Sequence, residues 1–108
     1  MESLTRSDPQ TLLPVLQALA DENRLRIVAT LREGERCVCV LQDLVGLGQS
    51  LLSHHLRVLR DAGVVVDRKE GRWVHYSLAP EALEGLEGFL RELRDAAPPG
   101  VPGVACCP

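Results

Sequence analysis

With 108 residues, 45% of them hydrophobic but only 3% aromatic, the chain can form one domain around one core of Leu, Val and Ala side chains. It contains no run of eighteen apolar residues that would span a membrane, and its polar N-terminus, MESLTRSDPQ, does not resemble a signal peptide. We therefore expect a protein of the reducing cytoplasm, whose four cysteines are ligands or redox groups rather than structural disulfides.

The formal net charge of −3 is unevenly distributed along the chain. Residues 49–75 contain five arginine and lysine residues against three acidic residues, a net charge of +2, which leaves −5 for the rest. A basic segment in an otherwise acidic chain is typical of a face that binds nucleic acid, although a chance surface distribution is the alternative.

Two amphipathic helices are expected in the first third of the chain. The first covers residues 8–20 and has Pro9 near its start. Asp21 should end it and cap a second helix, from about Glu22 to Glu33, by accepting hydrogen bonds from the first backbone N–H groups. Gly34 follows as the stop. The residues expected on the apolar sides are Leu12, Leu16 and Leu19 in the first helix, and Leu25, Val28 and Leu31 with Ile27 in the second.

The stretch from Glu35 to Gly63 predicts a helix-turn-helix, in which a short apolar helix and a longer one meet at the corner Gly46-Leu47-Gly48. The longer helix repeats apolar residues at i, i+3, i+4 and i+7, which predicts that His55 is packed. Its other face is short, polar and basic, which suits base edges and phosphates. The apolar face consists of Leu52, His55, Leu56 and Leu59. The polar face consists of Ser50, Ser53, His54, Arg57 and Arg60.

Two β-prone runs follow and predict a hairpin, which would be the wing of a winged helix. Its turn is placed at Glu70-Gly71, because glycine in the second position of a two-residue turn allows a tight hairpin. Arg68, Lys69 and Arg72 gather at the tip and could contact phosphates or the minor groove, with a tip that merely faces solvent as the alternative. In the second strand, Val74, Tyr76 and Leu78 are expected to face inward, and Trp73, His75 and Ser77 outward.

The last predicted helix begins at Pro80 and carries leucines at spacings of 3, 4 and 3 residues. This apolar stripe is narrow for a helix packed in a globular core and favours a partner helix. Gly85 and Gly88 each cost about 1 kcal/mol relative to alanine, which close approach of two helices would explain. We therefore expect a homodimer formed by this helix and the first one, with packing onto its own domain as the alternative. The expected interface residues are Leu12, Leu16, Leu83, Leu86, Leu90 and Leu93.

Two pairs of cysteines carry the chemistry. Cys37 and Cys39 lie at the head of the short helix, where the helix N-terminus lowers the pKa of a thiol and favours the thiolate that soft ions bind. Residues two apart in a regular helix point about 200° apart, so these sulfurs share one ion only if the first turn frays or unwinds. Two cysteines packed in the core are the alternative.

Residues 97–108 contain too many prolines and glycines to continue the last helix, so we expect a flexible tail after a domain of residues 1–96. The tail carries the vicinal Cys106 and Cys107, for which packing in a core is no explanation. They favour a thiolate site, and an inert or oxidised tail end is the alternative.

Four stretches, LADENRLRIVATL, ERCVCVLQDL, GQSLLSHHLRVLRDAGVV and EGRWVHYSL, together resemble the ArsR/SmtB metalloregulatory repressors over about residues 10–95. The resemblance implies a homodimeric winged helix-turn-helix, mainly α with a β-hairpin wing. It implies a repressor that binds an operator and leaves the DNA when it binds a metal or metalloid. It also implies that Cys37 and Cys39 are the family's thiolate site.

The chain departs from ligand patterns of this family in three places. Gln42 stands where arsenite repressors of the enterobacterial type have a third cysteine, residues 1–36 contain no cysteine, and no histidine follows His75. The missing thiolate is therefore expected from Cys106 or Cys107. Three thiolates satisfy As(III) or Sb(III), the preferred inducers, whereas Cd(II) or Pb(II) is the alternative.

Two further alternatives are a winged helix that senses oxidation through a Cys37–Cys107 disulfide and a thiol enzyme. Against an enzyme, the thiols are accompanied by no general base, no phosphate-binding loop and no C-x-x-C, and the sequence indicates no organic cofactor. Binding of one arsenic to Cys37 and Cys39 is expected to strip the first turn from their helix. The two recognition helices of the dimer would then no longer match the spacing of the operator half-sites.

The expected partner is an operator with an imperfect inverted repeat, because a two-fold dimer presents two recognition helices about 34–36 Å apart, one turn of DNA, or a multiple of this. The residues expected to contact it are Gln49, Ser50, Ser53, His54, Arg57, Arg68, Lys69 and Arg72.

Overall fold

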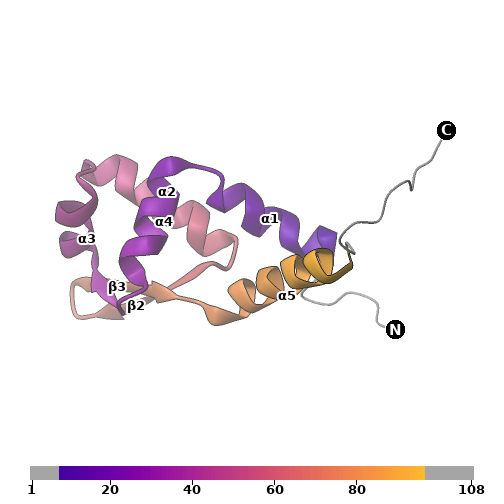
Figure 1. Cartoon of the computed structure of the whole chain (residues 1–108). Helices are drawn as coiled ribbons and strands as arrows, with labels where there is room; N and C mark the ends of the chain where they lie inside the picture. The colour runs from indigo at the N-terminus through magenta and orange to yellow at the C-terminus, as the bar shows by residue number, and fades with distance from the viewer. Residues whose placement is uncertain (1–7, 97–108) are drawn as a thin grey trace.

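The computed structural model describes residues 8–96 as a helical domain with a small antiparallel sheet. The elements in chain order are α1 (Pro9–Leu19), α2 (Glu22–Leu31), β1 (Arg36–Cys37), α3 (Val38–Val45), α4 (Gln49–Asp61), β2 (Val65–Glu70), β3 (Trp73–Leu78) and α5 (Pro80–Ala96). Helices α1 and α5 pack together at one end of the molecule, and α3 lies at the opposite end (Figure 1). No helix between residues 8 and 96 is both long and apolar enough to cross a membrane.

Side-chain caps fix the starts of the first two helices. The carboxylate of Asp8 accepts a hydrogen bond from the backbone N–H of Gln10 at 2.8 Å. Asp21 accepts from the N–H groups of Asn23 at 2.9 Å and Arg24 at 3.1 Å, which confirms its predicted role. Such a cap contributes about 1 kcal/mol to helix stability. Local chemistry therefore places both helix starts.

The predicted helix-turn-helix is confirmed. Helix α3 ends at Gly46, whose φ of +71° is the left-handed conformation that glycine adopts without strain. Helix α4 begins three residues later, and all four residues of its predicted apolar face are buried. Its polar face points away from this core. The sequence pattern therefore gives the orientation of α4 correctly.

The sheet has the strand order β1-β3-β2, with the β2–β3 hairpin as the wing. The pairing of Glu70 with Trp73 makes Gly71-Arg72 the two-residue turn, so the predicted turn at Glu70-Gly71 is wrong by one residue. The first position of the turn requires a positive φ, and Gly71 supplies +63° there. With the α3–α4 corner, this hairpin completes a winged helix-turn-helix.

The two-residue strand β1 was not predicted, and it changes the surroundings of the hairpin. Arg36 pairs with Tyr76, and Cys37 pairs with His75. Because β1 lies beside β3, the side chain of His75 is only 20% exposed, so the predicted outward position is wrong for this residue. Trp73, which lies beyond the end of β1, is exposed as predicted.

The core gathers residues from every helix and from the hairpin, and it corrects two expectations. Leu25 is 51% exposed, whereas Ile27 is completely buried and forms the inner side of α2 with Leu31. Leu12 is 2% exposed and packs with Val15 and Ala18 on the inner side of α1, so it cannot belong to a surface that meets a partner. The faces that α2 and α1 bury are set by the helices they pack against.

His55 joins α4 to α2 through a hydrogen bond inside the core. The guanidinium Nη1 of Arg24 lies 3.1 Å from His55 Nδ1, and Arg24 Nε donates to the carbonyl of Ala18 at 2.6 Å. A guanidinium has only donors, so His55 Nδ1 must accept and the ring must be neutral. Burial lowers the pKa of His55 below its ordinary value, while the facing Asp21 raises it and the facing Arg24 and His54 lower it further.

This lowered pKa predicts a loss of stability in mild acid. The unfolded chain takes up a proton on His55 near the ordinary value of about 6.5, whereas the folded protein does so only at lower pH. The free energy of unfolding should therefore be highest above about pH 6.5 and fall as the pH drops below it. Urea titrations at several pH values measure this dependence.

The variant His55→Gln should have a smaller loss of stability between about pH 6.5 and pH 5 than the wild type. His54→Gln, which changes the exposed neighbour, is the matched control and should stay close to the wild-type dependence, because His54 makes the smallest contribution to the lowered pKa of His55. Identical pH profiles for His55→Gln and the wild type would contradict the role of the buried ring.

Candidate functional site

The thiols of Cys37 and Cys39 lie side by side, with their Sγ atoms 2.9 Å apart. Cys37 has extended dihedral angles (φ −69°, ψ 148°) and precedes α3 as its N-cap, while Cys39 lies in the first turn. The 200° separation of a regular helix therefore does not apply. Cys37 is half-buried and Cys39 is exposed, so the alternative of two cysteines packed in the core is wrong.

Little movement is needed for one ion to bind both sulfurs. Two sulfurs about 2.3 Å from a tetrahedral ion lie about 3.7 Å from each other. The pair must therefore open by only about 1 Å from its 2.9 Å separation. The predicted loss of the first turn of α3 is not required for two sulfurs to reach one ion.

The two thiols lie within hydrogen-bond distance of each other, and either can be the donor. The hydrogen bond from Cys39 lowers the pKa of Cys37, and the backbone N–H groups of Cys39 and Val40 at the start of α3 add to this effect. The pKa of Cys39 is raised, mainly because its proton serves that hydrogen bond. The pair thus offers one thiolate more readily than an isolated cysteine does, and thiolates are what soft ions bind.

The two thiols open onto a cavity of about 550 Å³ between the start of α3, helix α4 and strand β3. The apolar part of the cavity wall consists of Leu56, Val74 and Tyr76. The polar part consists of Gln49, Ser53, Arg57 and Arg72. The remaining lining residues are Cys37, Val38, Cys39, Gln42, Arg60 and Trp73. The thiol pair and the polar face of α4 therefore border one space.

Several lining residues were not predicted as functional, among them Gln42, Trp73 and Arg60. Gln42 follows Cys39 by three positions and so lies on the same side of α3, which its spacing could have indicated. Trp73 was expected to face outward. No residue close to it in the sequence indicates that its indole lines a cavity together with the thiols. Arg60 was assigned to the polar face of α4 without a role at the cavity.

The side chains of α4 that were predicted to contact DNA form one exposed surface. They are Gln49, Ser50, Ser53, His54 and Arg57. No side chain caps the start of α4, so its first backbone N–H groups also face this surface.

The basic side chains near this surface differ in their partners. Arg68 makes two hydrogen bonds to Glu35, at 2.7 and 3.0 Å, which compensate much of its charge. Arg60 lies within 3.7 Å of Asp61 and 3.5 Å of Asp67. Among residues 8–96, none of Arg57, Lys69 and Arg72 has a carboxylate within ion-pair distance, so no ion pair in this part of the chain compensates these three cations. They are Arg57 on α4, Lys69 on β2 and Arg72 in the turn.

Within the part of the chain that the structure describes, the thiol pair has no third ligand. No cluster of three Cys, His, Asp or Glu side chains there is arranged to hold a metal ion. Cys106 and Cys107, the predicted source of the third thiolate, lie outside the described residues, as does the rest of the predicted tail. The pair itself fits two ligands of a thiophilic ion.

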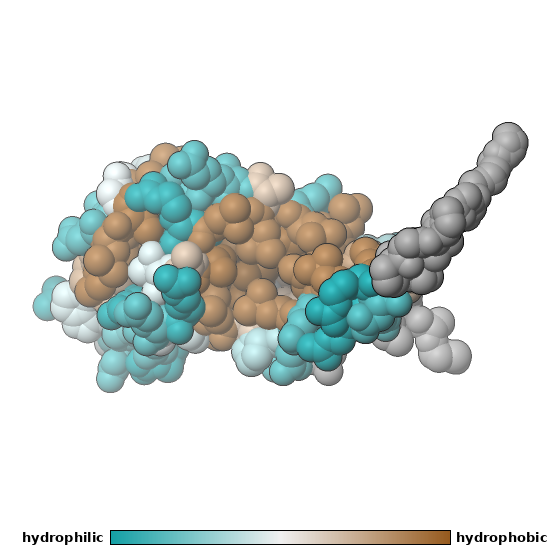
Figure 2. Space-filling model, in the orientation of Figure 1, coloured by the Kyte–Doolittle hydropathy of each residue, from teal (hydrophilic) through white to brown (hydrophobic). Residues whose placement is uncertain are grey.

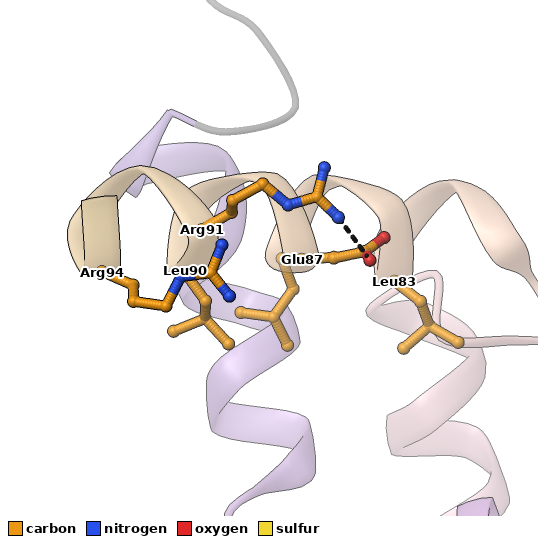
Figure 3. A pocket seen from close by; sticks show the side chains of 6 residues that line it. Leu83, Glu87, Leu90, Arg91 and Arg94 are labelled. Atoms are coloured by element: carbon orange, nitrogen blue, oxygen red, sulfur yellow. Dashed lines mark hydrogen bonds and ion pairs between the residues drawn. The ribbon is translucent and has the colours of Figure 1, made fainter. Parts of the chain in front are cut away.

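A second surface lies on the outer sides of α1 and α5. Apolar side chains gather over α1 in the view of Figure 2. Leu16 on α1 and Leu90 and Leu93 on α5 are exposed. Leucine side chains of α5 border a cavity of about 520 Å³. Leu83 and Leu90 point to the same side of α5, next to the ion pair of Arg91 with Glu87 at 2.9 Å (Figure 3). The cavity is lined by Leu83, Leu86, Glu87, Leu90, Arg91 and Arg94.

Known proteins share this sequence pattern. Residues 21–66 match the family described as bacterial regulatory protein, arsR family. The chain is 42% identical over 83 residues to the arsenic resistance transcriptional regulator ArsR1 of Pseudomonas putida, covering 76% of this chain and 65% of that protein. It is 50% identical over 72 residues to the arsenical resistance operon repressor of Escherichia coli, covering 64% of this chain and 62% of that protein.

A cadmium resistance transcriptional regulatory protein, the CadC homolog of Staphylococcus aureus, is 36% identical over 94 residues, covering 84% of this chain and 78% of that protein. The chain thus spans less than two thirds of the first two relatives but more than two thirds of this one. The three relatives are named as regulators, which contradicts the alternative of a thiol enzyme.

Solved structures give the same fold. The crystal structure of an ArsR family transcriptional regulator has a TM-score of 0.75 and 26% identity, covering 82% of this chain and 92% of that chain. The homodimeric winged helix-turn-helix DNA-binding domain Mb0332 of Mycobacterium bovis has a TM-score of 0.66 and 30% identity, covering 80% of each chain. With its sequence, fold and thiol pair in agreement, the chain belongs to the arsR family of bacterial regulatory proteins.

Proposed function

We propose that this protein is a transcriptional repressor that leaves its operator when Cys37 and Cys39 bind As(III) or Sb(III). One observation carries the proposal: the two thiols, 2.9 Å apart, open onto the same cavity as the polar face of α4. An ion held by the pair therefore lies next to the surface that contacts DNA. The third thiolate comes from Cys106 or Cys107.

On DNA, α4 lies in the major groove, with Gln49, Ser50, Ser53, His54 and Arg57 facing the bases and phosphates. The wing contributes Lys69 and Arg72, which have no carboxylate partner among residues 8–96, and Arg68 to a smaller extent because Glu35 already binds it. The ion-pair pattern supports a ranking in which Arg57, Lys69 and Arg72 contribute more to phosphate binding than Arg60 and Arg68 do.

Replacing Arg57 with alanine should weaken operator binding by about 1–3 kcal/mol and reduce the dependence of binding on salt. Fluorescence anisotropy with a labelled operator, selected from random sequences by the wild-type protein, measures both effects. Arg32→Ala, which removes an exposed arginine beyond the end of α2, is the control for net charge. Equal affinity of Arg57→Ala and wild type at several salt concentrations would contradict this position for α4.

The second copy needed for an inverted repeat pairs through α1 and α5. Leu16, Leu90 and Leu93 are exposed there, and Leu83 and Leu86 line the adjoining cavity. The Mycobacterium bovis domain is named as homodimeric, which supports a dimer of this chain. A two-fold dimer then binds two half-sites about one turn of DNA, or a multiple of it, apart.

Softness and ligand number favour trivalent arsenic or antimony. Sulfur ligands exclude hard ions such as Mg(II) and Ca(II). The relatives named for arsenic and arsenical resistance support As(III), and the relative named for cadmium resistance supports Cd(II) as the second candidate. Oxidation of the thiols is the third, because the hydrogen bond from Cys39 lowers the pKa of Cys37.

Titrating the wild-type protein on its labelled operator with sodium arsenite, cadmium chloride and hydrogen peroxide separates these candidates. We expect arsenite to release the DNA at the lowest concentration, in the presence of a monothiol reductant. Release by peroxide alone, reversed by reductant, would instead establish an oxidation sensor. Release by cadmium at a lower concentration than arsenite would show that cadmium is the inducer, and the proposed repressor function would stand.

A further inference from the structure

We propose that Arg24 positions the recognition helix α4 through His55, and that it does so only while the His55 ring is neutral, so that operator binding weakens in mild acid. This inference rests on the proposed function for its DNA readout. It adds a proton as a second signal, at a place in the core away from the thiols. It starts from the contacts of Arg24.

Arg24 joins three helices at one point. The Asp21 cap of α2 accepts from the backbone N–H of Arg24 at 3.1 Å, so the cap fixes where this residue lies. Its guanidinium Nε donates to the carbonyl of Ala18 in the last turn of α1 at 2.6 Å, and Nη1 donates to His55 Nδ1 at 3.1 Å. The side chain of Arg24 therefore links α1 and α2 to α4.

His55 lies on the helix that carries the proposed DNA surface. Its ring is 5% exposed on the inner side of α4, whereas Ser53, His54 and Arg57 on the other side are exposed. Because a helix moves as one body, a shift of the ring relative to Arg24 also shifts these three side chains. A binding surface must be held within about 0.5 Å of its productive geometry, so a small shift is enough to weaken binding.

A proton on His55 removes the acceptor of this link. An imidazolium and a guanidinium have only donors, so the hydrogen bond between the two side chains is lost and two positive charges face each other. Burial adds to the cost, because the charged ring is kept from water. The protonated ring is therefore expected to move away from Arg24, and α4 moves with it.

The other charges around the ring do not remove this cost. The charged groups that face His55 are Asp21 and Arg24 on α2 and His54 on its own helix. Of these, only Asp21 favours the charged ring, and it already accepts hydrogen bonds as the cap of α2. Helix α1 carries no charged side chain, and on β2 the carboxylate of Asp67 lies 3.5 Å from Arg60 instead.

The interface of α4 with α1 and α2 has room for such a movement. A cavity of about 390 Å³ borders Arg24 on one side and Val58 and Asp61 of α4 on the other. Because operator DNA binds the arrangement with a neutral ring, DNA and the proton oppose each other reciprocally. Protonation of His55 thus favours release of the operator.

The sign of the effect separates this device from ordinary electrostatics. A proton on the exposed His54 adds a positive charge to the proposed DNA surface, which strengthens binding to phosphates. Protonation of His55 acts in the opposite direction. The test therefore uses His54→Gln as the background, so that the two effects do not cancel.

Anisotropy of an operator that carries a pH-insensitive dye measures affinity between pH 7.5 and 5.0 at constant ionic strength. The His54→Gln protein should bind about threefold or more weakly at pH 5.0 than at pH 7.5. The double variant His54→Gln/His55→Asn should change by less than about twofold, because an asparagine amide keeps an acceptor near the position of Nδ1 and takes up no proton. His75 is present in both proteins, so its contribution cancels in the comparison.

Arg24→Gln tests the positioning residue itself. It should weaken operator binding at pH 7.5 by about fivefold or more, because it removes the guanidinium that links the helices. Its affinity should also depend less on pH than that of the wild type, since no cation then opposes the protonated ring. Arg32→Ala, which removes an exposed arginine beyond the end of α2, is the matched control and should keep the wild-type affinity and pH dependence.

Equal pH dependence of the His54→Gln protein and the double variant would overturn the inference, as would Arg24→Gln with wild-type affinity. Circular dichroism identifies the lowest pH at which the proteins are folded, and affinities are compared down to that pH. If no variant and no wild-type protein binds an operator at pH 7.5, the proposed function fails instead. NMR of the free protein then still decides the inference: the amide signals of α4 should shift as His55 takes up a proton, and unchanged signals would contradict it.

Discussion

Replacing Cys37 with serine should abolish the release of operator DNA by arsenite. The substitution removes the thiol with the lowered pKa and leaves Cys39 without the neighbour 2.9 Å away. A hydroxyl binds soft ions poorly, so the loss of one As–S bond should raise the arsenite concentration for half-release by about a hundredfold or more. Cys39→Ser should have the same effect.

Anisotropy of the labelled operator, titrated with arsenite, measures this loss. The single variants Cys106→Ser and Cys107→Ser are the controls, since each leaves one tail thiol in place and should be milder. A Cys37→Ser protein that arsenite still releases at the wild-type concentration would remove the thiol pair from the mechanism. It would also show that Cys37 has only a structural role at the start of α3.

The double change Leu90→Glu/Leu93→Glu should convert the proposed dimer to a monomer and weaken operator binding by about 10²–10⁴-fold. Both leucines are 53% exposed on α5, and burial of one leucine contributes about 1.5–3 kcal/mol. Two carboxylates per copy would face their equivalents across a two-fold axis and repel each other. A monomer binds one half-site and loses the gain from simultaneous binding of two.

Sedimentation velocity of the free proteins and operator anisotropy measure the two effects. Leu25→Glu is the matched control, because Leu25 is 51% exposed but lies on α2, away from the proposed interface. This control should remain dimeric. A Leu90→Glu/Leu93→Glu protein that sediments like the wild type would show that α5 does not form the interface.

Local chemistry explains why much of the fold could be predicted. Asp21 caps α2 through its own neighbours, Gly46 ends α3 in a conformation that other residues avoid, and the spacing of Leu52 and Leu56 gives the buried face of α4. Each of these features depends on residues within one or two helical turns. The polar surface of α4, with Arg57, follows from the same spacing.

Expectations failed where distant residues decide the environment. Leu25 fits the helical period but lies where no other element covers it, and Ile27 takes the central position instead. His75 is partly covered because β1, more than thirty residues earlier in the chain, pairs with its strand. Arg68 fits a phosphate-binding tip by sequence, but Glu35 from before β1 binds it.

The candidate site divides in the same way. The two thiols at a helix start and the polar, basic helix that follows could be predicted from the sequence, because capping and helical spacing are local. The sequence could not show that Cys37, Arg57 and Trp73 border one cavity, because packing of α3, α4 and β3 brings together residues about twenty and thirty-six positions apart. Likewise, only packing of whole elements decided which cations remain without a carboxylate partner among residues 8–96, because each ion pair joins side chains according to their final positions.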